Sequence, residues 1–224
     1  MKRPLAAAAA LALAGALGVA GRVSGRPDGD PAFAASASIR AQVRAAQCGS
    51  WRWLVKTLAD DPAKQGQVKF SPQWSSVRKL AQLGSPDAPW NTAPDFPPPP
   101  AFARFGKVER QAVLLPVRLS KAKKEPDGDI HLIVSAPTDQ TLELVVEFPA
   151  LICTDTSPKK QQMDNARQKL LDACGPIISS TWKDLHHAKA YIGGVPFFDF
   201  GHGKGHPPNG AEIHPALGFS AASC

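Results

Sequence analysis

The sequence predicts a mainly β protein, an OB-fold-like antiparallel Greek-key barrel with one helix between its third and fourth strands. Apolar and polar residues alternate in three successive segments, 113–119, 130–136 and 141–148, as they do in half-buried strands. A helical pattern follows at 158–174, and further strand-like segments come after it. A helix after the third strand is typical of an OB-fold, whereas a β-sandwich, the alternative architecture, does not need one.

The amino-terminal residues are typical of a signal peptide. Lys2 and Arg3 precede an apolar run, 5–20, that is shorter than the roughly 20 residues of a membrane-spanning helix. We therefore predict a signal peptide at 1–20 and an exported protein, periplasmic or extracellular, with no transmembrane segment in its mature form. An uncleaved anchor is the alternative. Residues 21–45 have no periodic apolar face, which predicts a flexible leader.

Residues 46–103 are predicted to form an N-terminal strap. In "FSPQWSSVRKLAQLG", Ser71 is a suitable N-cap, Pro72 suits the first helical turn and Gly84 can end a short helix. The prolines of "SPDAPWNTAPDFPPPPA" exclude regular structure and favour an extended polyproline path. The barrel domain is then expected over 104–224.

Local signals place the remaining barrel elements. Ser157 is expected to cap the helix, Pro158 to begin it and Gly175 to end it, with an apolar stripe of Met163, Ala166, Leu170 and Cys174. Gly193 and Gly194 inside the strand-like "HAKAYIGGV" predict a bulge or a barrel corner. The last strands are expected around "PFFDF" and "EIHPALGF", whose consecutive phenylalanines favour core positions over a platform for stacking bases.

The cysteines predict a disulfide-bonded protein. All four lie beyond the signal peptide, and an even number of cysteines in an exported chain indicates disulfides, for which three pairings are possible. Cys153 follows the third strand and Cys174 lies on the apolar stripe of the helix, so we predict that these two pair between helix and barrel. Cys48 is then paired with Cys224 by elimination.

The charge of the chain is modestly basic. Of the formal net charge of +7, Lys2 and Arg3 contribute +2, which leaves +5 for the mature protein. The excess is scattered over "RLSKAKK", "SPKKQQ" and "HHAK". It would favour association with nucleic acid or an anionic envelope component without requiring either, and we expect a monomer.

Two segments carry the candidate site. The first is "DGD", Asp127-Gly128-Asp129, whose composition is typical of a turn before a strand. If segments 130–136 and 141–148 form a hairpin with aligned apolar faces, Glu147 must oppose either His131 or Asp129. That arrangement gathers an imidazole and carboxylates on one face, which either bind a divalent cation such as Ca²⁺ or form a solvated, salt-bridged surface.

The second segment is "HGKGHPPNGAEIHP", whose polar residues either fix a loop to the barrel or bind a ligand. The candidate ligand-binding residues of both segments are therefore Asp127, Asp129, His131, Glu147, His202, Asn209, Glu212 and His214. No serine–histidine–aspartate order, phosphate-binding loop or pair of catalytic acids stands out, so no catalytic residue is nominated and no cofactor is assigned.

The motifs "WRWLVKTLAD", "RFGKVERQ", "DGDIHLIV", "VVEFP" and "GVPFFDFGHGKGHPPNGAEIHPALGF" resemble those of a family of secreted bacterial proteins to which no activity is assigned. The resemblance covers about residues 51–219 in the same order. The chain departs from the family pattern at Lys204, His206 and Pro207. This resemblance implies a relationship and export, but no chemistry.

A weaker similarity is to staphylococcal nuclease, an exported OB-fold in which a "DGD" opens a strand and one aspartate binds calcium. Asp127 and Asp129 match that motif. Pro149 stands near the position where the nuclease needs an arginine, and no glutamate follows Pro158 to serve as the general base. We therefore expect a binding module for a ligand or partner in the cell envelope, with a divergent metal-dependent nuclease or hydrolase as the alternative.

Overall fold

The computed structural model describes residues 47–49, 51–84, 104–199 and 205–224. The predicted signal peptide and leader, the proline-rich segment and His202 lie outside these residues. Within the described residues, no helix is both long enough and apolar enough to cross a membrane.

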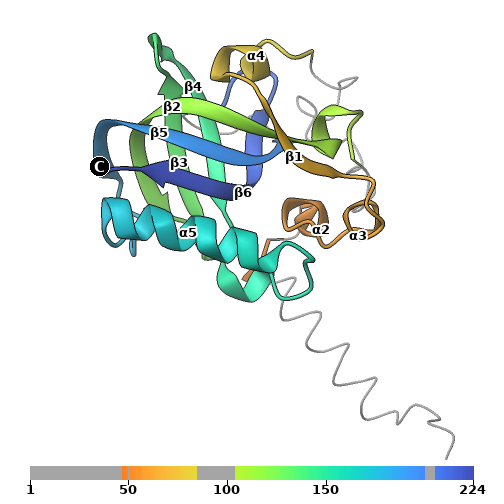
Figure 1. The fold of residues 1–224 in the computed structure, drawn as a ribbon. Coiled ribbons are helices and arrows are strands. Elements are labelled where there is room, and N and C mark those ends of the chain that lie inside the picture. Colours follow the sequence, from red (N-terminus) through yellow and green to blue (C-terminus); the bar gives the residue numbers. More distant parts are fainter. Residues whose placement is uncertain (1–46, 50, 85–103, 200–204) are drawn as a thin grey trace, which may run out of the picture. The chain divides into compact units, whose positions relative to one another are not determined.

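The described part of the chain is mainly β, with a six-stranded mixed sheet whose strands curve round an apolar core (Figure 1). Its strands are β1 (Lys69–Trp74), β2 (Gln111–Lys124), β3 (Ile130–Ala136), β4 (Asp139–Phe148), β5 (Lys183–Phe198) and β6 (Ala211–Ala221). They are ordered β1-β2-β3-β4-β6-β5, and β2 also pairs with β5. Strands β2 to β6 therefore form a continuous ring of pairings.

The sheet is not wholly antiparallel, so this part of the fold prediction is wrong. β4 and β6 pair in parallel, as do β1 and β2, while the other pairs are antiparallel. The parallel pair of β4 and β6 arises because a helix and the whole of β5 separate the two strands along the chain. Such a long crossover allows the chain to return in its original direction.

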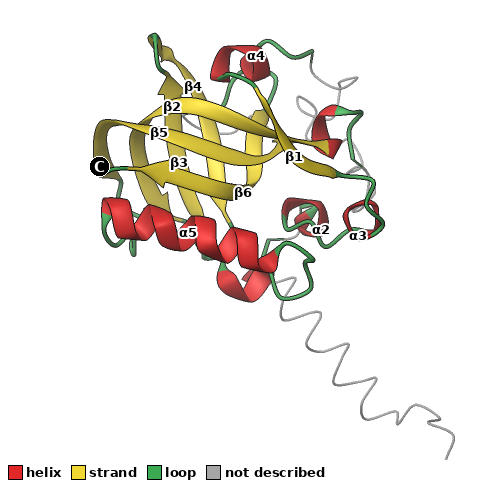
Figure 2. Ribbon diagram, in the orientation of Figure 1, coloured by secondary structure: helices red, strands yellow, loops and turns green. Residues whose placement is uncertain are grey.

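The helices are short, except for the one predicted after the third barrel strand (Figure 2). They are α2 (Trp53–Lys56), α3 (Asp61–Lys64), α4 (Val77–Ala81) and α5 (Lys160–Cys174), with 3₁₀ turns η1 (Val108–Arg110) and η2 (Leu151–Cys153). α5 lies between β4 and β5 and buries the predicted stripe of Met163, Ala166, Leu170 and Cys174.

Two predicted helix starts are wrong. Ser157 does not cap α5, because its hydroxyl accepts the N–H of Lys159 in a turn before the helix. Ser71 and Pro72 belong to strand β1, and the helix that follows is capped by Ser76, whose hydroxyl accepts the N–H of Lys79 at 3.1 Å. Pairing of β1 with the start of β2, a tertiary contact, overrides the local helical signal.

The core lies inside the curved sheet and under α5. The alternating residues of β2 point into it, with Leu115, Val117 and Leu119 almost fully buried. Phe197 and Phe198 are both buried, which confirms core positions for the phenylalanines. The β5–β6 register shifts at Gly193 and Gly194, so the predicted irregularity is present.

The predicted disulfide pairing is wrong. Cys48 bonds to Cys153 and Cys174 bonds to Cys224, with Cα–Cα distances of 5.6 and 4.7 Å. The prediction failed because Cys153 lies beside the start of α5, where Thr154 contacts Asp164, whereas Cys174 ends the helix. A helix of 15 residues is about 22 Å long, which is too far for one disulfide to span.

Candidate functional site

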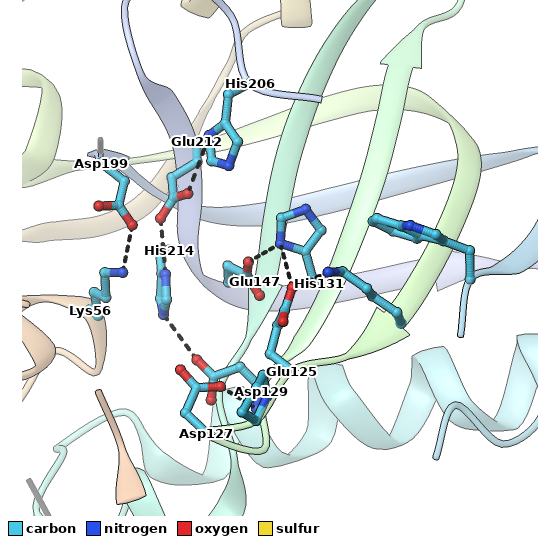
Figure 3. A pocket seen from close by; sticks show the side chains of 13 residues that line it. Lys56, Glu125, Asp127, Asp129, His131, Glu147, Asp199, His206, Glu212 and His214 are labelled. Carbon is cyan, nitrogen blue, oxygen red and sulfur yellow. Dashed lines mark hydrogen bonds and ion pairs between the residues drawn. The ribbon is translucent and has the colours of Figure 1, made fainter. Parts of the chain in front are cut away.

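A cavity of about 490 Å³ opens beside the turn between β2 and β3 (Figure 3). Its walls carry two lysines, Lys56 and Lys123, and three histidines, His131, His206 and His214. They also carry six carboxylates, those of Glu125, Asp127, Asp129, Glu147, Asp199 and Glu212. We refer to this cavity as the acidic pocket.

The "DGD" sequence is the turn that was predicted, and it also orients two carboxylates. Gly128 has φ +89°, a conformation that favours glycine. The Asp127 side chain accepts the N–H of Asp129 at 3.1 Å, and the Asp129 side chain accepts the N–H of Ala150 at 2.7 Å. Arg167 donates to the carbonyl of Gly128 at 2.9 Å. The turn therefore holds both aspartates at the edge of the pocket, and burial raises the pKa of Asp127.

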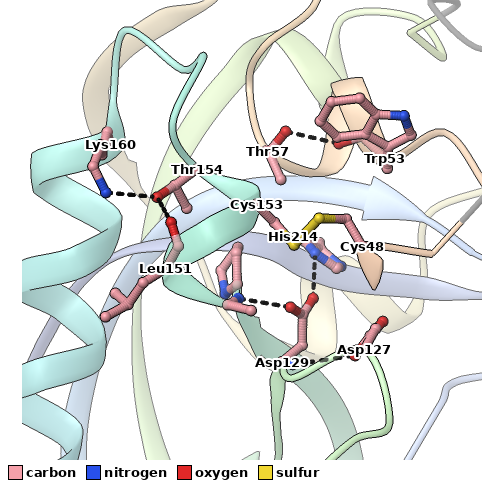
Figure 4. The surroundings of a disulfide bond; sticks show 12 residues. Cys48, Trp53, Thr57, Asp127, Asp129, Leu151, Cys153, Thr154, Lys160 and His214 are labelled. Carbon is pink, nitrogen blue, oxygen red and sulfur yellow. Dashed lines mark hydrogen bonds and ion pairs between the residues drawn. A yellow bond between two sulfur atoms is a disulfide. The ribbon is translucent and has the colours of Figure 1, made fainter. Parts of the chain in front are cut away.

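The Cys48–Cys153 disulfide lies next to this turn (Figure 4). Cys48 and Cys153 pack with Ala150, the residue whose N–H binds Asp129. The bridge thereby ties the segment that precedes α2 to η2, the turn that follows β4.

Glu147 and His131 form the centre of the pocket. They are directly opposite each other on β4 and β3, and Glu147 Oε1 lies 2.5 Å from His131 Nδ1. Glu147 Oε2 is buried and has no hydrogen-bond partner among the described residues, although the side chain lines the pocket. Burial raises the pKa of Glu147 well above its usual value and lowers that of His131, so the resting pair favours uncharged forms.

His214 on β6 connects two carboxylates. Its Nδ1 lies 3.0 Å from Glu212 Oε1, and its Nε2 lies 3.5 Å from Asp129 Oδ2. Burial alone would lower the pKa of His214, but the contacts with Asp129 and Glu212 outweigh it and raise the pKa to about 9. His214 is therefore a cation at neutral pH. Glu212 also faces His206, with Oε2 3.9 Å from Nδ1.

Lys56 closes one side of the pocket from α2. Its Nζ lies 2.6 Å from Asp199 Oδ2, and Asp199 follows β5 directly. Burial opposes the charge of Lys56, but attraction to Asp199 and Glu212 outweighs burial and raises its pKa, so this lysine stays protonated. The ion pair therefore neutralises Asp199.

Trp182 forms an aromatic wall at another side of the pocket. The Nζ atoms of Lys121 and Lys123 lie 4.8 and 4.9 Å from its ring centroid, and the ring of His131 meets it edge-on at 5.6 Å. Lys123 also pairs with Glu125 at 2.8 Å. The ring is thus in contact with cations while it remains about a third exposed.

Six of the eight predicted site residues line the acidic pocket: Asp127, Asp129, His131, Glu147, Glu212 and His214. Asn209 does not. Its amide donates to the carbonyls of Leu80 and Leu83 at 2.8 and 2.9 Å, so it fixes the loop to the end of α4. His202 lies outside the described residues.

Several residues of the pocket were not among the predicted site residues: Lys56, Lys123, Glu125, Trp182, Asp199 and His206. Asp199 had a signal, since a carboxylate interrupts the apolar "FFDF". Glu125 precedes the "DGD" turn by two residues. No pattern in the sequence marks Lys56 or Trp182, because only tertiary packing brings their segments to this cavity.

The pocket carries an excess of negative charge. Six carboxylates line it, against Lys56, Lys123 and charged His214, so the carboxylates outnumber the cationic side chains. Across the described ranges, no group of three or more His, Cys, Asp or Glu side chains is arranged to hold a metal ion.

Comparison of the chain with family models, curated proteins and solved structures gives no match.

Proposed function

We propose that this protein is an exported binding module with OB-fold topology, and that the acidic pocket takes a cationic ligand. The topology is supported by the ring of pairings from β2 to β6 and by the position of α5 between β4 and β5. Export is supported by the two disulfides, since such bonds persist in oxidising compartments.

The observation that carries the proposal is Glu147 Oε2, a buried acceptor without a hydrogen-bond partner in the described part of the chain, inside a pocket with excess negative charge. A buried acceptor left unsatisfied costs about 1–3 kcal/mol. A cation in the pocket would satisfy that oxygen and offset the surplus of carboxylates. The whole chain is basic, so the preference for a cation comes from the lining of this pocket and not from the net charge.

The test is a thermal-shift screen of the full chain, purified from an oxidising compartment, with CaCl₂, MgCl₂, ZnCl₂, spermidine and a single-stranded oligonucleotide. We expect a cation to raise the melting temperature, because a ligand that binds only the folded state stabilises it. Glu147→Gln and Asp129→Asn should remove the shift. Glu143→Gln, a matched change on the same strand outside the pocket, should keep it. Stabilisation by the oligonucleotide alone, or a cation effect that both pocket variants retain, would overturn the proposal.

A divergent metal-dependent nuclease or hydrolase is the second candidate. One observation favours it: His131 with Glu147, and His214 with Asp129, pair imidazoles with carboxylates in a cavity where pKa values are strongly shifted. Incubation of DNA or RNA with the protein and Ca²⁺, Mg²⁺ or Zn²⁺ separates the two functions. Fragments that disappear with His131→Asn support a hydrolase, and intact nucleic acid supports a binding module.

A further inference from the structure

We propose that the cation bound in the acidic pocket is a guanidinium group, carried by arginine itself or by an arginine side chain of a peptide. This inference rests on the proposed function, because it specifies the chemical class of the cation. It follows from the size of the pocket, the distribution of its acceptors and its aromatic wall.

The pocket has the size of a site for an organic molecule. Its volume of about 490 Å³ falls in the range of roughly 300–1,000 Å³ that is usual for small-molecule sites. A guanidinium with its attached carbon chain fills such a space better than a single atom does, and the chain would extend toward the solvent side.

The acceptors are spread round the pocket. Asp129 and Glu212 lie on opposite sides of the His214 ring, since each contacts a different ring nitrogen (Figure 3). Glu147 projects from β4, and its Oε2 engages no described donor. The contact between Asp129 Oδ2 and His214, at 3.5 Å, is longer than a good hydrogen bond. A guanidinium has five N–H donors in a rigid plane and so can bind separated acceptors at once.

Trp182 supplies the aromatic wall of the pocket. Its ring contacts the ammonium groups of Lys121 and Lys123, so cations already lie on its π-system, and a guanidinium would take the place of one of them. A guanidinium stacks on aromatic faces and is more weakly hydrated than an ammonium. The acceptors Asp129, Glu147 and Glu212 are buried, so the cation that loses least on leaving water is favoured, which separates guanidinium from lysine-like ligands.

The experiment is isothermal titration calorimetry on the full chain with methylguanidinium, L-arginine and acetyl-Gly-Arg-Gly-amide, compared with methylammonium, L-lysine and CaCl₂. We expect the guanidinium compounds to bind about tenfold or more tightly than their ammonium counterparts. If L-arginine binds as tightly as the peptide does, the source of the guanidinium is a small molecule. If only the peptide binds, the source is an arginine side chain of a protein.

Variants locate the binding. Glu147→Gln should weaken guanidinium binding about tenfold or more, as expected when a charged acceptor is lost. Trp182→Ala should reduce the preference for guanidinium over ammonium. Because Trp182 is partly exposed, this variant should fold, and it tests the site even if Glu147→Gln does not fold. Glu143→Gln is the matched control and should bind as the unaltered protein does.

The outcomes separate the two proposals. Binding of CaCl₂ or methylammonium that depends on Glu147, without binding of any guanidinium compound, overturns this inference and leaves the cation-binding function intact. Guanidinium binding that both Glu147→Gln and Trp182→Ala leave unchanged places the site elsewhere and also overturns it. If no cation binds, both proposals fail.

Discussion

His131 and Glu147 face each other across β3 and β4, and their side chains meet with Nδ1 2.5 Å from Oε1. The contact lies at the centre of a pocket to which β6, α2 and the "DGD" turn add charged groups. Burial favours the protonated form of Glu147 and the neutral form of His131. The pair therefore rests uncharged while its surroundings are acidic, and this has consequences for binding.

Cation binding should release a proton. A bound cation favours ionised Glu147, whose pKa is raised in the resting protein chiefly by burial, so we expect affinity to rise as pH increases above the 4.5 of an ordinary glutamate. The neighbouring His214 and Lys56, whose pKa values are raised, stay protonated at neutral pH. Calorimetry in buffers of different ionisation enthalpy measures the released proton, and Glu147→Gln should abolish the release. Equal apparent enthalpies in all buffers would contradict this prediction.

The charge of His214 should make stability depend on pH. Its pKa rises from 6.5 in the unfolded chain to about 9 in the folded protein. The folded state thus holds the proton more tightly, so this stabilisation is complete below about pH 6.5 and is lost as pH rises through 9. It amounts to roughly 3 kcal/mol as an upper limit. Urea unfolding between pH 6.5 and 9 measures it. His214→Gln should flatten the slope over that interval, and an unchanged slope would show that another group is responsible.

The buried Arg52–Glu109 ion pair should be important for stability. Both side chains are fully buried, with Arg52 Nη2 2.5 Å from Glu109 Oε2, and Glu109 also accepts the N–H groups of Phe105 and Phe198. Glu109→Ala leaves a buried guanidinium without its carboxylate, which should cost about 3–5 kcal/mol. Arg78 pairs with Asp139 on the surface, so Arg78→Ala should cost about 1 kcal/mol or less. Urea unfolding of both variants tests the difference, and similar losses would refute it.

Gly210 should not tolerate a side chain. Its φ is +70°, and an added Cβ would lie 2.2 Å from the carbonyl oxygen of Asp199, the residue that pairs with Lys56. Gly66 is the matched control, with φ +72° and no atom within 4 Å of the added Cβ. Gly66→Ala should cost about 1–2 kcal/mol from the backbone alone, and Gly210→Ala roughly 1–3 kcal/mol more from overpacking. Melting curves of the two variants give the comparison, and equal losses would exclude the steric contribution.

The disulfides should be Cys48–Cys153 and Cys174–Cys224 in the native protein. Non-reducing peptide mapping should yield those two linked peptides, and a Cys153–Cys174 peptide would contradict the structure. Cys174 and Cys224 are separated by 50 residues, so replacing both with serine should destabilise the protein by about 4 kcal/mol on the chain-entropy model. Unfolding of the double variant by urea measures the loss.

Local pattern in the sequence was sufficient to predict β2, β3, β4 and α5, because burial of one face imposes a period on each element. It also limited Glu147 to two registers, and β4 has the one that places it opposite His131. Tertiary structure alone decided the parallel pairing of β4 with β6, the strand β1 and both disulfides. It also brought Lys56, Trp182 and Asp199 to the same cavity as the "DGD" turn. Periodicity records which face of an element is buried and not which distant element covers it, so contacts between separated segments are decided only when the chain packs.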